Sequence, residues 1–241
     1  MKVFEILTLF PEAFPGTLDL SIIKNARGVY WDMKAHDMRE YGIGKHKIVD
    51  DEVFSHLPGM LIRPDVVENA IEGIGFEKGR KIFLSPRGRV LDQRKVEELA
   101  NANEKILLLC GRYEGIDQRA IDYFGFEEVS IGNYILCGAE VAAMVLMEAV
   151  IRKLPGVIGN SASFVNESFA SEHELEISEN RYTRPAIWTT KKGDILEVDS
   201  ILRSGDHKKI ELFQKNGRKG INKGIGEQNA SVSARIRTKT D

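Results

Sequence analysis

Short, continuously apolar segments alternate along this chain with segments whose apolar residues recur at helical spacing. The run ILLLC at 106–110 is typical of a strand that is buried on both faces. The predicted strands are 1–9, 29–36, 81–84, 105–110 and 127–131. The predicted helices are 18–25, 63–74, 92–102, 117–123 and 140–153, of which the last is almost entirely apolar and therefore expected to be deeply buried. Strands that alternate with helices predict an α/β fold with a mostly parallel sheet.

The length of 241 residues suits one large domain or two small ones. No apolar run approaches the ~20 residues of a membrane-spanning helix, and acidic residues interrupt the apolar N-terminal segment. We therefore expect a cytoplasmic protein with no signal peptide and no membrane partner. Cys110 and Cys137 both end apolar runs, and we interpret both as reduced residues of the core.

Charge is distributed unevenly, although the net charge is only −2. Residues 161–180 contain five acidic residues and no Lys or Arg, whereas residues 203–241 contain ten Lys or Arg against four Asp or Glu. Such a basic end is either a solvated surface or an interaction surface. The predicted organisation is a first domain at 1–160, a flexible linker at 161–175, and a small, mainly helical domain at 176–241 with helices at 195–202 and 208–219 and a poorly ordered tail at 222–241.

Glycine-bearing loops follow three of the predicted strands, at 85–88, 111–115 and 131–138. In open α/β sheets, ligands bind in the crevice outside the carboxyl ends of the strands. One such loop is more often a simple tight turn, but three together indicate a ligand site. The sequence contains no G-x-G-x-x-G after its first strand, no phosphate-binding P-loop, no H-E-x-x-H and no G-x-S-x-G, so dinucleotide, P-loop, zinc-protease and serine-hydrolase sites are unsupported.

Several short motifs lie in these loops and elsewhere in the chain. They are LSPRGR (84–89), CGRYEGID (110–117), SIGNYIL (130–136) followed by Gly138 and Glu140, PGVIG (155–159), ESFA (167–170), RYTRP (181–185), GKHKIVDD (44–51) and PGM (58–60). In order and spacing, these motifs resemble those of the bacterial tRNA (guanine-N1)-methyltransferases over roughly residues 1–215. The combination of CGRYEGID with SIGNYIL is highly specific for that family.

The resemblance implies a SPOUT-type α/β fold with a deep C-terminal trefoil knot, which is a rare exception among protein topologies. It also implies a homodimer that binds S-adenosylmethionine in the knot. The implied activity is methylation of N1 of guanosine 37 in tRNA, immediately 3′ of the anticodon. An RNA methyltransferase of the SPOUT type with another RNA target, or a non-catalytic RNA-binding module of the same fold, remains an alternative.

The resemblance assigns the cofactor site to the three loops. It implies that backbone groups and apolar contacts hold the cofactor and that the carboxylate of Glu114 lies beside it, which suits a cationic sulfonium ligand. The implied cofactor-binding residues are Leu84, Ser85, Pro86, Gly111, Glu114, Ile131, Gly132, Asn133, Tyr134, Ile135, Leu136 and Gly138.

Methylation at N1 of guanine requires a base that removes the N1 proton and a cation or donor that stabilises negative charge on O6. By resemblance, these roles fall to Glu167 and Arg152. Glu167 departs from the family pattern, which usually has Asp there. Without the family, Glu167 would be interpreted as a solvated linker acid and Arg152 as a cation at a helix C-terminus.

The expected tRNA-binding residues rest on charge and not on a motif. They are Lys208, Lys209, Lys215, Arg218 and Lys219. Enzymes of this family also use Mg²⁺, but no cluster of ligands in the sequence places a metal site.

Overall fold

The computed structural model describes residues 1–54, 58–159, 167–169, 176–177, 180–217 and 219–220. The chain divides into two compact units, Met1–Gly159 and Asn160–Asp241. Most of the predicted linker and all of the predicted tail lie outside the described residues. Among the described helices, none is long and apolar enough to cross a membrane.

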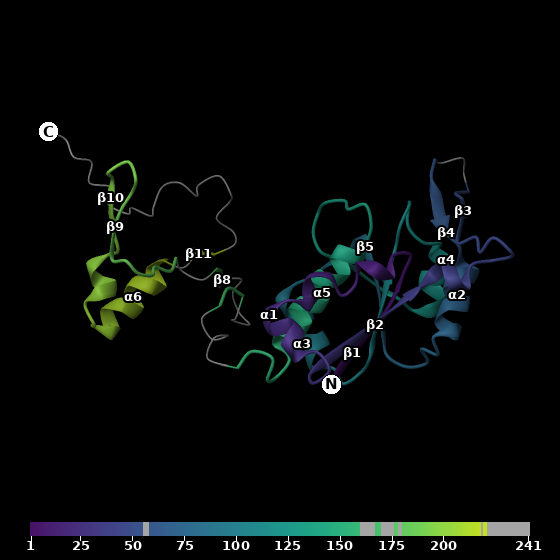
Figure 1. Ribbon diagram of the computed structural model, residues 1–241, viewed down its shortest axis with the longest axis horizontal. Helices are drawn as coiled ribbons and strands as arrows, with labels where there is room; N and C mark the ends of the chain where they lie inside the picture. The colour runs from purple at the N-terminus through teal and green to yellow at the C-terminus, as the bar shows by residue number, and fades with distance from the viewer. Residues whose placement is uncertain (55–57, 160–166, 170–175, 178–179, 218, 221–241) are drawn as a thin grey trace. The chain divides into compact units, whose positions relative to one another are not determined.

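A five-stranded, wholly parallel sheet forms the centre of the first unit (Figure 1). Its strand order is β2-β1-β6-β5-β7. The strands are β1 (Lys2–Thr8), β2 (Trp31–Asp37), β5 (Arg80–Val90), β6 (Ile106–Cys110) and β7 (Glu127–Ser130). This sheet confirms the predicted α/β fold with a mostly parallel sheet.

Helices cover both faces of this sheet (Figure 1). On one face lie α1 (Ser21–Ala26), α3 (Gln93–Asn101) and α5 (Glu140–Lys153), and on the other lie α2 (Pro64–Gly73) and α4 (Gln118–Phe124). The central strand β6 is buried throughout because its successive side chains enter opposite cores: Leu108 packs on the side of α5, whereas Leu107 and Leu109 pack on the side of α2.

Two of the helices begin at an aspartate, as their sequences predict. The Asp92 carboxylate accepts a hydrogen bond from the backbone N–H of Lys95 at 2.8 Å, which starts α3. Asp117 accepts from the N–H of Arg119 at 2.9 Å, which starts α4. Each cap satisfies a backbone donor that a helix N-terminus otherwise leaves unpaired.

The predicted end of the third strand at Leu84 is wrong, because β5 continues to Val90 through the segment that was predicted as a loop. Its register against β7 shifts between Leu84 and Arg89. Gly88 makes this continuation possible, because a Cβ at this position would collide with the backbone of Glu128 and Val129. The glycine that suggested a turn in fact allows two strands to approach closely.

A short antiparallel hairpin, which is absent from the predicted elements, precedes α2. Here β3 (Asp50–Glu52) pairs antiparallel with β4 (Met60–Ile62). Short 3₁₀ helices complete the unit at Pro11–Ala13, Gly16–Asp19 and Met38–Tyr41.

In the second unit, the helix predicted at 195–202 is wrong. The segment instead forms β10 (Ile195–Glu197), which pairs antiparallel with β9 (Ile187–Thr189), and a 3₁₀ turn at Ser200–Arg203. The Thr190 side chain fixes the hairpin, because its hydroxyl accepts hydrogen bonds from the N–H groups of Lys192 and Asp194. The remaining elements are α6 (His207–Gly217) and the antiparallel pair β8 (Glu176–Ile177) and β11 (Lys219–Gly220).

Candidate functional site

The segments that follow β1, β6 and β7 meet at the carboxyl edge of the parallel sheet, together with the end of β5. Leu84 pairs in register with Cys110 on one side and with Val129 on the other, so the segments that follow β6 and β7 begin on either side of β5. Hydrogen bonds tie them together: Ala139 N–H donates to the Gly111 carbonyl at 3.3 Å, and Leu91 N–H donates to the Ser130 carbonyl at 2.8 Å. Three glycine-bearing segments thus form one site.

The loop 131–139 folds around the tyrosine at its centre. The Tyr134 hydroxyl donates to the Ile131 carbonyl at 3.1 Å, and the Tyr134 N–H donates to the Gly132 carbonyl at 3.0 Å. Gly132 has a φ of 152°, and a Cβ there would collide with the Tyr134 ring. The side chains of Tyr134, Ile135 and Leu136 are all exposed. Within the described chain, the N–H groups of 135–138 have no hydrogen-bond acceptor.

A partly buried ion pair contacts this loop. Arg112 Nη2 is 2.8 Å from Glu140 Oε2, and the Glu140 side chain is only 4% exposed. Glu140 also accepts a hydrogen bond from the Thr8 hydroxyl at 2.7 Å. Arg112 in turn donates through Nη1 to the Cys137 carbonyl at 3.3 Å, and its guanidinium lies 4.3 Å from the centre of the Phe10 ring.

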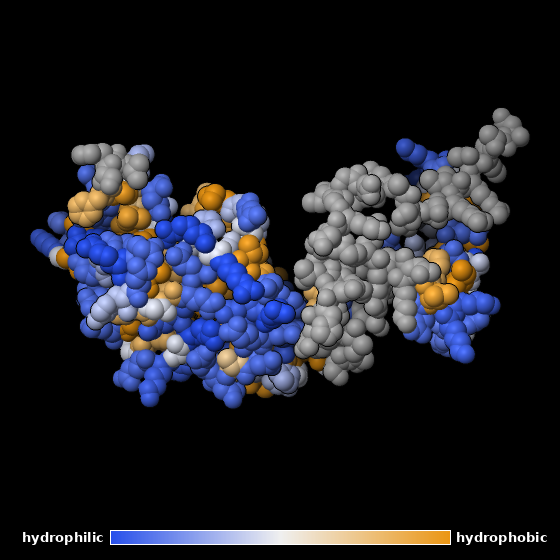
Figure 2. Space-filling view, turned by 180° about the vertical axis from the view of Figure 1, so that it is seen from behind, coloured by the Kyte–Doolittle hydropathy of each residue, from blue (hydrophilic) through white to orange (hydrophobic). Residues whose placement is uncertain are grey.

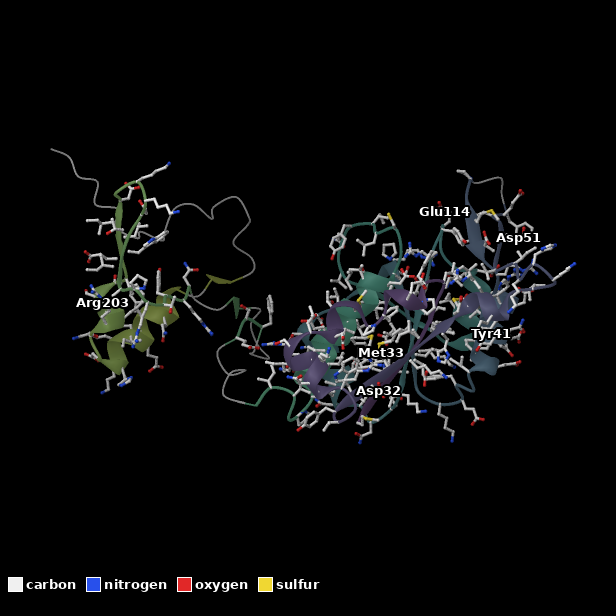
Figure 3. The ribbon with its side chains drawn as sticks, in the orientation of Figure 1. Asp32, Met33, Tyr41, Asp51, Glu114 and Arg203 are labelled. Atoms are coloured by element: carbon white, nitrogen blue, oxygen red, sulfur yellow. The ribbon has the colours of Figure 1, made fainter. Side chains whose placement is uncertain are left out.

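Glu114 occupies the loop after β6, against the β3–β4 hairpin. Its N–H donates to the Met60 carbonyl at 3.0 Å, and a Cβ at Gly59 would collide with its side chain. Figure 3 shows Glu114 next to this hairpin, which also carries Asp51. The pairing continues at Ile62, whose N–H donates to the Gly115 carbonyl at 3.0 Å. The exposed Glu114 carboxylate is therefore held at the edge of the site by two neighbouring elements.

The two cysteines differ in their surroundings. Cys110 ends β6 and is fully buried, and burial raises the pKa of its thiol well above the ordinary value, with a further rise from Glu140. The prediction that Cys137 is also a core residue is wrong, because Cys137 lies in the exposed loop after β7. Its apolar neighbours Ile135 and Leu136 are also exposed and do not belong to the core.

No group of three or more His, Cys, Asp or Glu side chains that could hold a metal ion occurs among the residues that the structure describes. This finding supplies no location for Mg²⁺.

Comparison with known proteins identifies the family. Residues 1–223 match the family model described as tRNA (Guanine-1)-methyltransferase TrmD. Proteins named tRNA (guanine-N(1)-)-methyltransferase are similar to the chain over most of its length. The one from Ehrlichia ruminantium (strain Gardel) is 46% identical over 213 residues, which cover 87% of each chain. The one from Rhodospirillum rubrum is 47% identical over 206 residues, 85% of this chain and 82% of the relative, and the one from Rickettsia akari is 40% identical over 223 residues, 90% and 93%.

The chain belongs to the tRNA (guanine-N1)-methyltransferase family. This membership confirms the resemblance and the predicted methylation of tRNA at N1 of guanine, and methyltransferases of this family use S-adenosylmethionine as the methyl donor.

In this methyltransferase, the predicted cofactor residues come from three segments that the sheet brings to one edge. Leu84, Ser85 and Pro86 lie within β5, Gly111 and Glu114 follow β6, and the others lie in the loop after β7. Ser85 is buried, and its hydroxyl accepts a hydrogen bond from the Arg87 N–H at 3.2 Å. Their individual contacts with a cofactor stay predictions.

The two predicted catalytic residues lie in different units of the methyltransferase. Arg152 is in the last turn of α5 in the first unit, and Glu167 is a partly exposed residue of the second. Their approach to a common guanine therefore stays a prediction.

The predicted tRNA-binding residues are described only in part. Lys208 and Lys209 are exposed at the start of α6, and Lys209 pairs with Asp206 at 3.1 Å. Lys215 lies in α6 and Lys219 in β11, whereas Arg218 lies outside the described residues.

Sequence reasoning missed the roles of Arg112, Glu140 and Thr8. Arg112 and Glu140 both lie in the motifs that carry the family resemblance, so their positions were visible but their pairing was not. Thr8 carries no signal in the sequence, because a threonine at the end of a strand is common.

Proposed function

We propose that this methyltransferase transfers a methyl group from S-adenosylmethionine to N1 of guanosine 37 in tRNA, in a site assembled from two subunits. The observation that carries the proposal is the convergence of three family motifs on one edge of the sheet. The finer features implied by the family belong to the same proposal, namely the trefoil knot through these segments, a mainly helical tRNA-binding C-terminal domain and a cytoplasmic location.

The residues at the edge of the sheet fit the cofactor. When bound, S-adenosylmethionine supplies an electrophilic methyl group on a positively charged sulfur. The exposed apolar side chains of Tyr134, Ile135 and Leu136 suit its adenine, and the unpaired N–H groups of 135–138 offer donors for its acceptor atoms. The Glu114 carboxylate favours its positive charge. The missing side chain at Gly132 keeps the loop in this shape.

The chemistry of guanine assigns the remaining roles. N1 carries a proton at neutral pH, so the Glu167 carboxylate accepts this proton as the new bond forms. Negative charge then develops on O6, which the Arg152 guanidinium stabilises. Both residues lie within or beside family motifs, and both have the chemical character that these roles require.

Arg152 lies too far from the cofactor loops of its own subunit to act there. Helix α5 begins at Glu140, which contacts Thr8 and Arg112 at the carboxyl edge. Arg152 follows twelve residues later, about 18 Å along the helix at the usual rise per residue. The chain after α5 returns to the opposite edge, where Gly156 packs against Tyr30 just before β2. We therefore infer that Arg152 serves the site of a second subunit.

The exposed surface of α5 favours this arrangement. Val141 and Val145, one helical turn apart, are exposed although they belong to the most apolar helix of the chain. Hydrophobic areas also interrupt the mainly hydrophilic surface of this unit in Figure 2. A two-fold axis across α5 would pack the helices of two subunits antiparallel, and each Arg152 would then lie beside the partner's cofactor loop. Symmetric dimers of this kind are the commonest oligomers.

The basic residues near the C-terminus supply the proposed tRNA contacts. Lys208, Lys209, Lys215, Arg218 and Lys219 would neutralise phosphates, which makes their contribution to affinity dependent on salt.

The proposal is tested by incubating the protein with bulk tRNA and labelled S-adenosylmethionine and then mapping the methylated nucleotide. We expect N1-methylated guanosine 3′ of the anticodon. Glu167→Gln should lower the single-turnover rate by about 10²–10⁴-fold without changing cofactor affinity, because it keeps the size of the side chain and removes the base.

Other outcomes would contradict the proposal. Methylation at another nucleotide or in another RNA would indicate a different target, and RNA binding without methylation would indicate a non-catalytic module. Full single-turnover activity of Glu167→Gln would remove this residue from the mechanism.

A further inference from the structure

We propose that Arg112 and Glu140 act together as a positioning pair, a partly buried ion pair that holds the loop 131–139 in the conformation that receives the cofactor. The inference rests on the proposed cofactor site at this loop. Neither side chain needs to touch the reacting atoms, because both act through the backbone of the loop.

Glu140 is the residue of the pair that is anchored in the first unit. It is the first residue of α5, where the partial positive charge of the helix N-terminus favours a carboxylate. One carboxylate oxygen, Oε1, accepts from the Thr8 hydroxyl at 2.7 Å and from Arg112 Nε at 3.3 Å, and Oε2 lies 2.8 Å from Arg112 Nη2. With three donors around it, Glu140 joins the end of β1, the loop after β6 and the start of α5.

Arg112 connects Glu140 to the loop 131–139. Its Nη1 donates to the carbonyl of Cys137, while its guanidinium lies over the ring of Phe10. Gly138 makes room for it, because a Cβ at Gly138 would collide with the Arg112 side chain. The hydrogen bond from the Ala139 N–H to the Gly111 carbonyl runs beside this contact. The loop is thus held at Cys137 and Ala139, on either side of Gly138 at the end of the segment predicted to bind the cofactor.

The pairing also neutralises two charges, each of which would be unfavourable alone. A lone Arg112 next to the loop would repel a sulfonium cation, and a lone Glu140 would be a buried, uncompensated charge. Together they are neutral. A planar guanidinium suits the position because it reaches the carboxylate through two nitrogens and the Cys137 carbonyl through the third, which a lysine ammonium cannot do in the same geometry.

The test separates the positioning of the loop from the stability of the whole protein. Arg112→Met leaves Glu140 unpaired, whereas the double variant Arg112→Met with Glu140→Leu removes both charges and restores much of the stability that the single change costs. For each variant we would measure hydrogen exchange of the amides in 131–139 without cofactor, cofactor affinity by calorimetry, unfolding by urea, and the single-turnover rate at saturating cofactor.

We expect faster exchange of the hydrogen-bonded amides of this loop, those of Gly132, Tyr134 and Ala139, in both variants, including the double variant whose unfolding is close to wild type. If the receptive conformation falls to about a tenth of the population, the apparent Kd for the cofactor rises about tenfold. The single-turnover rate at saturating cofactor should remain within about threefold of wild type, because binding then restores the conformation. Arg112→Lys should give an intermediate Kd.

The matched control is Arg119→Met, which removes an exposed guanidinium from the next helix, where it pairs with Asp117 at 2.7 Å. It should change neither loop exchange nor cofactor affinity. Wild-type exchange and affinity in the double variant would overturn the inference and leave the pair a purely structural one. Exchange is measured without cofactor, so it decides the matter even if the wild-type protein bound no cofactor, a result that would instead overturn the proposed function.

Discussion

The glycine at position 132 shows how one residue can decide whether a ligand site exists. Its φ of 152° is rare for residues with a side chain, and its missing Cβ leaves room for the ring of Tyr134. We predict that Gly132→Val weakens cofactor binding by at least tenfold, because the loop has to leave the conformation that receives the cofactor. Calorimetric titration with S-adenosylmethionine measures the effect.

The control for this prediction is Gly125→Ala. Gly125 ends α4 with a φ of 65°, and an added Cβ there meets no atom within 4 Å. The substitution should cost about 1 kcal/mol of stability through backbone strain and leave cofactor affinity unchanged. Unchanged affinity in Gly132→Val would remove this loop from the cofactor site.

For single residues, the sequence indicated which segment carries a given side chain, but it did not always indicate whether that side chain is buried or exposed. Glu114 and Gly132 lie in the segments that follow β6 and β7, and their contacts with a cofactor stay predictions. Cys137 was predicted in the core because it ends the apolar run YILC, but this residue and its neighbours are exposed. A single sequence cannot separate an apolar side chain that faces a core from one that faces a ligand, because both are selected for the same chemistry.

The helix α4 depends on its first residue. The Asp117 carboxylate accepts from the N–H of Arg119 and pairs with its guanidinium, and the hydrogen bond from this side chain lowers the pKa of Asp117 below its usual value. Asp117→Ala should destabilise the protein by about 0.5–2 kcal/mol at neutral pH, the range for loss of an N-cap. Urea unfolding monitored by circular dichroism measures this difference.

The dependence on pH follows from the direction of the shift. Because the pKa of Asp117 is lower in the folded than in the unfolded chain, its charge contributes stability that is fully present above the unfolded pKa of about 4 and is lost as the pH falls through the folded pKa. The difference between wild type and Asp117→Ala should therefore shrink below about pH 4. Asp122→Ala, on the same helix, should stay within about 0.5 kcal/mol of wild type, since Asp122 accepts only from the exposed Gln118. Equal losses at both positions would contradict the capping argument.

Elements were predictable where one periodic pattern dominated. The apolar runs of β1, β6 and α5 gave their positions within a residue or two, because each run is long and nearly unbroken. The prediction failed at Gly88, where the same residue type serves a turn or a close approach of strands, and at 195–202, where the Thr190 side chain stabilises a hairpin across several residues. Both outcomes depend on contacts with other segments and not on local pattern.

At the scale of the whole molecule, the parallel sheet followed from the alternation of strands and helices, but the assembly of a catalytic site did not. The motifs assign Glu167 and Arg152 to one reaction without saying which copy of the chain supplies each. The length of α5 supplies the missing argument, because it separates Arg152 from the cofactor loops of its own subunit.

Complementation between two defective subunits tests this arrangement. Arg152→Ala removes the proposed cation from one chain, and Gly132→Val blocks the proposed cofactor loop in the other. At a cofactor concentration well below the Kd of Gly132→Val, each variant alone should be nearly inactive. Arg152→Ala loses a transition-state donor worth about 10²–10³-fold, and Gly132→Val leaves its own site largely without cofactor. In a mixed dimer, the intact cofactor loop of the first chain meets the intact Arg152 of the second, so one of the two sites is complete. Random pairing makes about half of the dimers mixed, and the mixture should therefore recover about a quarter of wild-type activity.

The measurement is the single-turnover rate on tRNA of the co-expressed pair, with Gly125→Ala replacing Gly132→Val as the control. The control mixture retains intact cofactor loops in all chains, so every site that receives an intact Arg152 is active and about half of the wild-type activity remains. If Arg152 acted within its own subunit, the first mixture would stay nearly inactive, because no chain would then carry both intact residues. Sedimentation of the wild-type protein as a single 27.1 kDa species at micromolar concentration would contradict the two-subunit site directly. The length of α5 thus leads to a testable prediction: Arg152 completes the site of the partner subunit, and mixed dimers show whether it does.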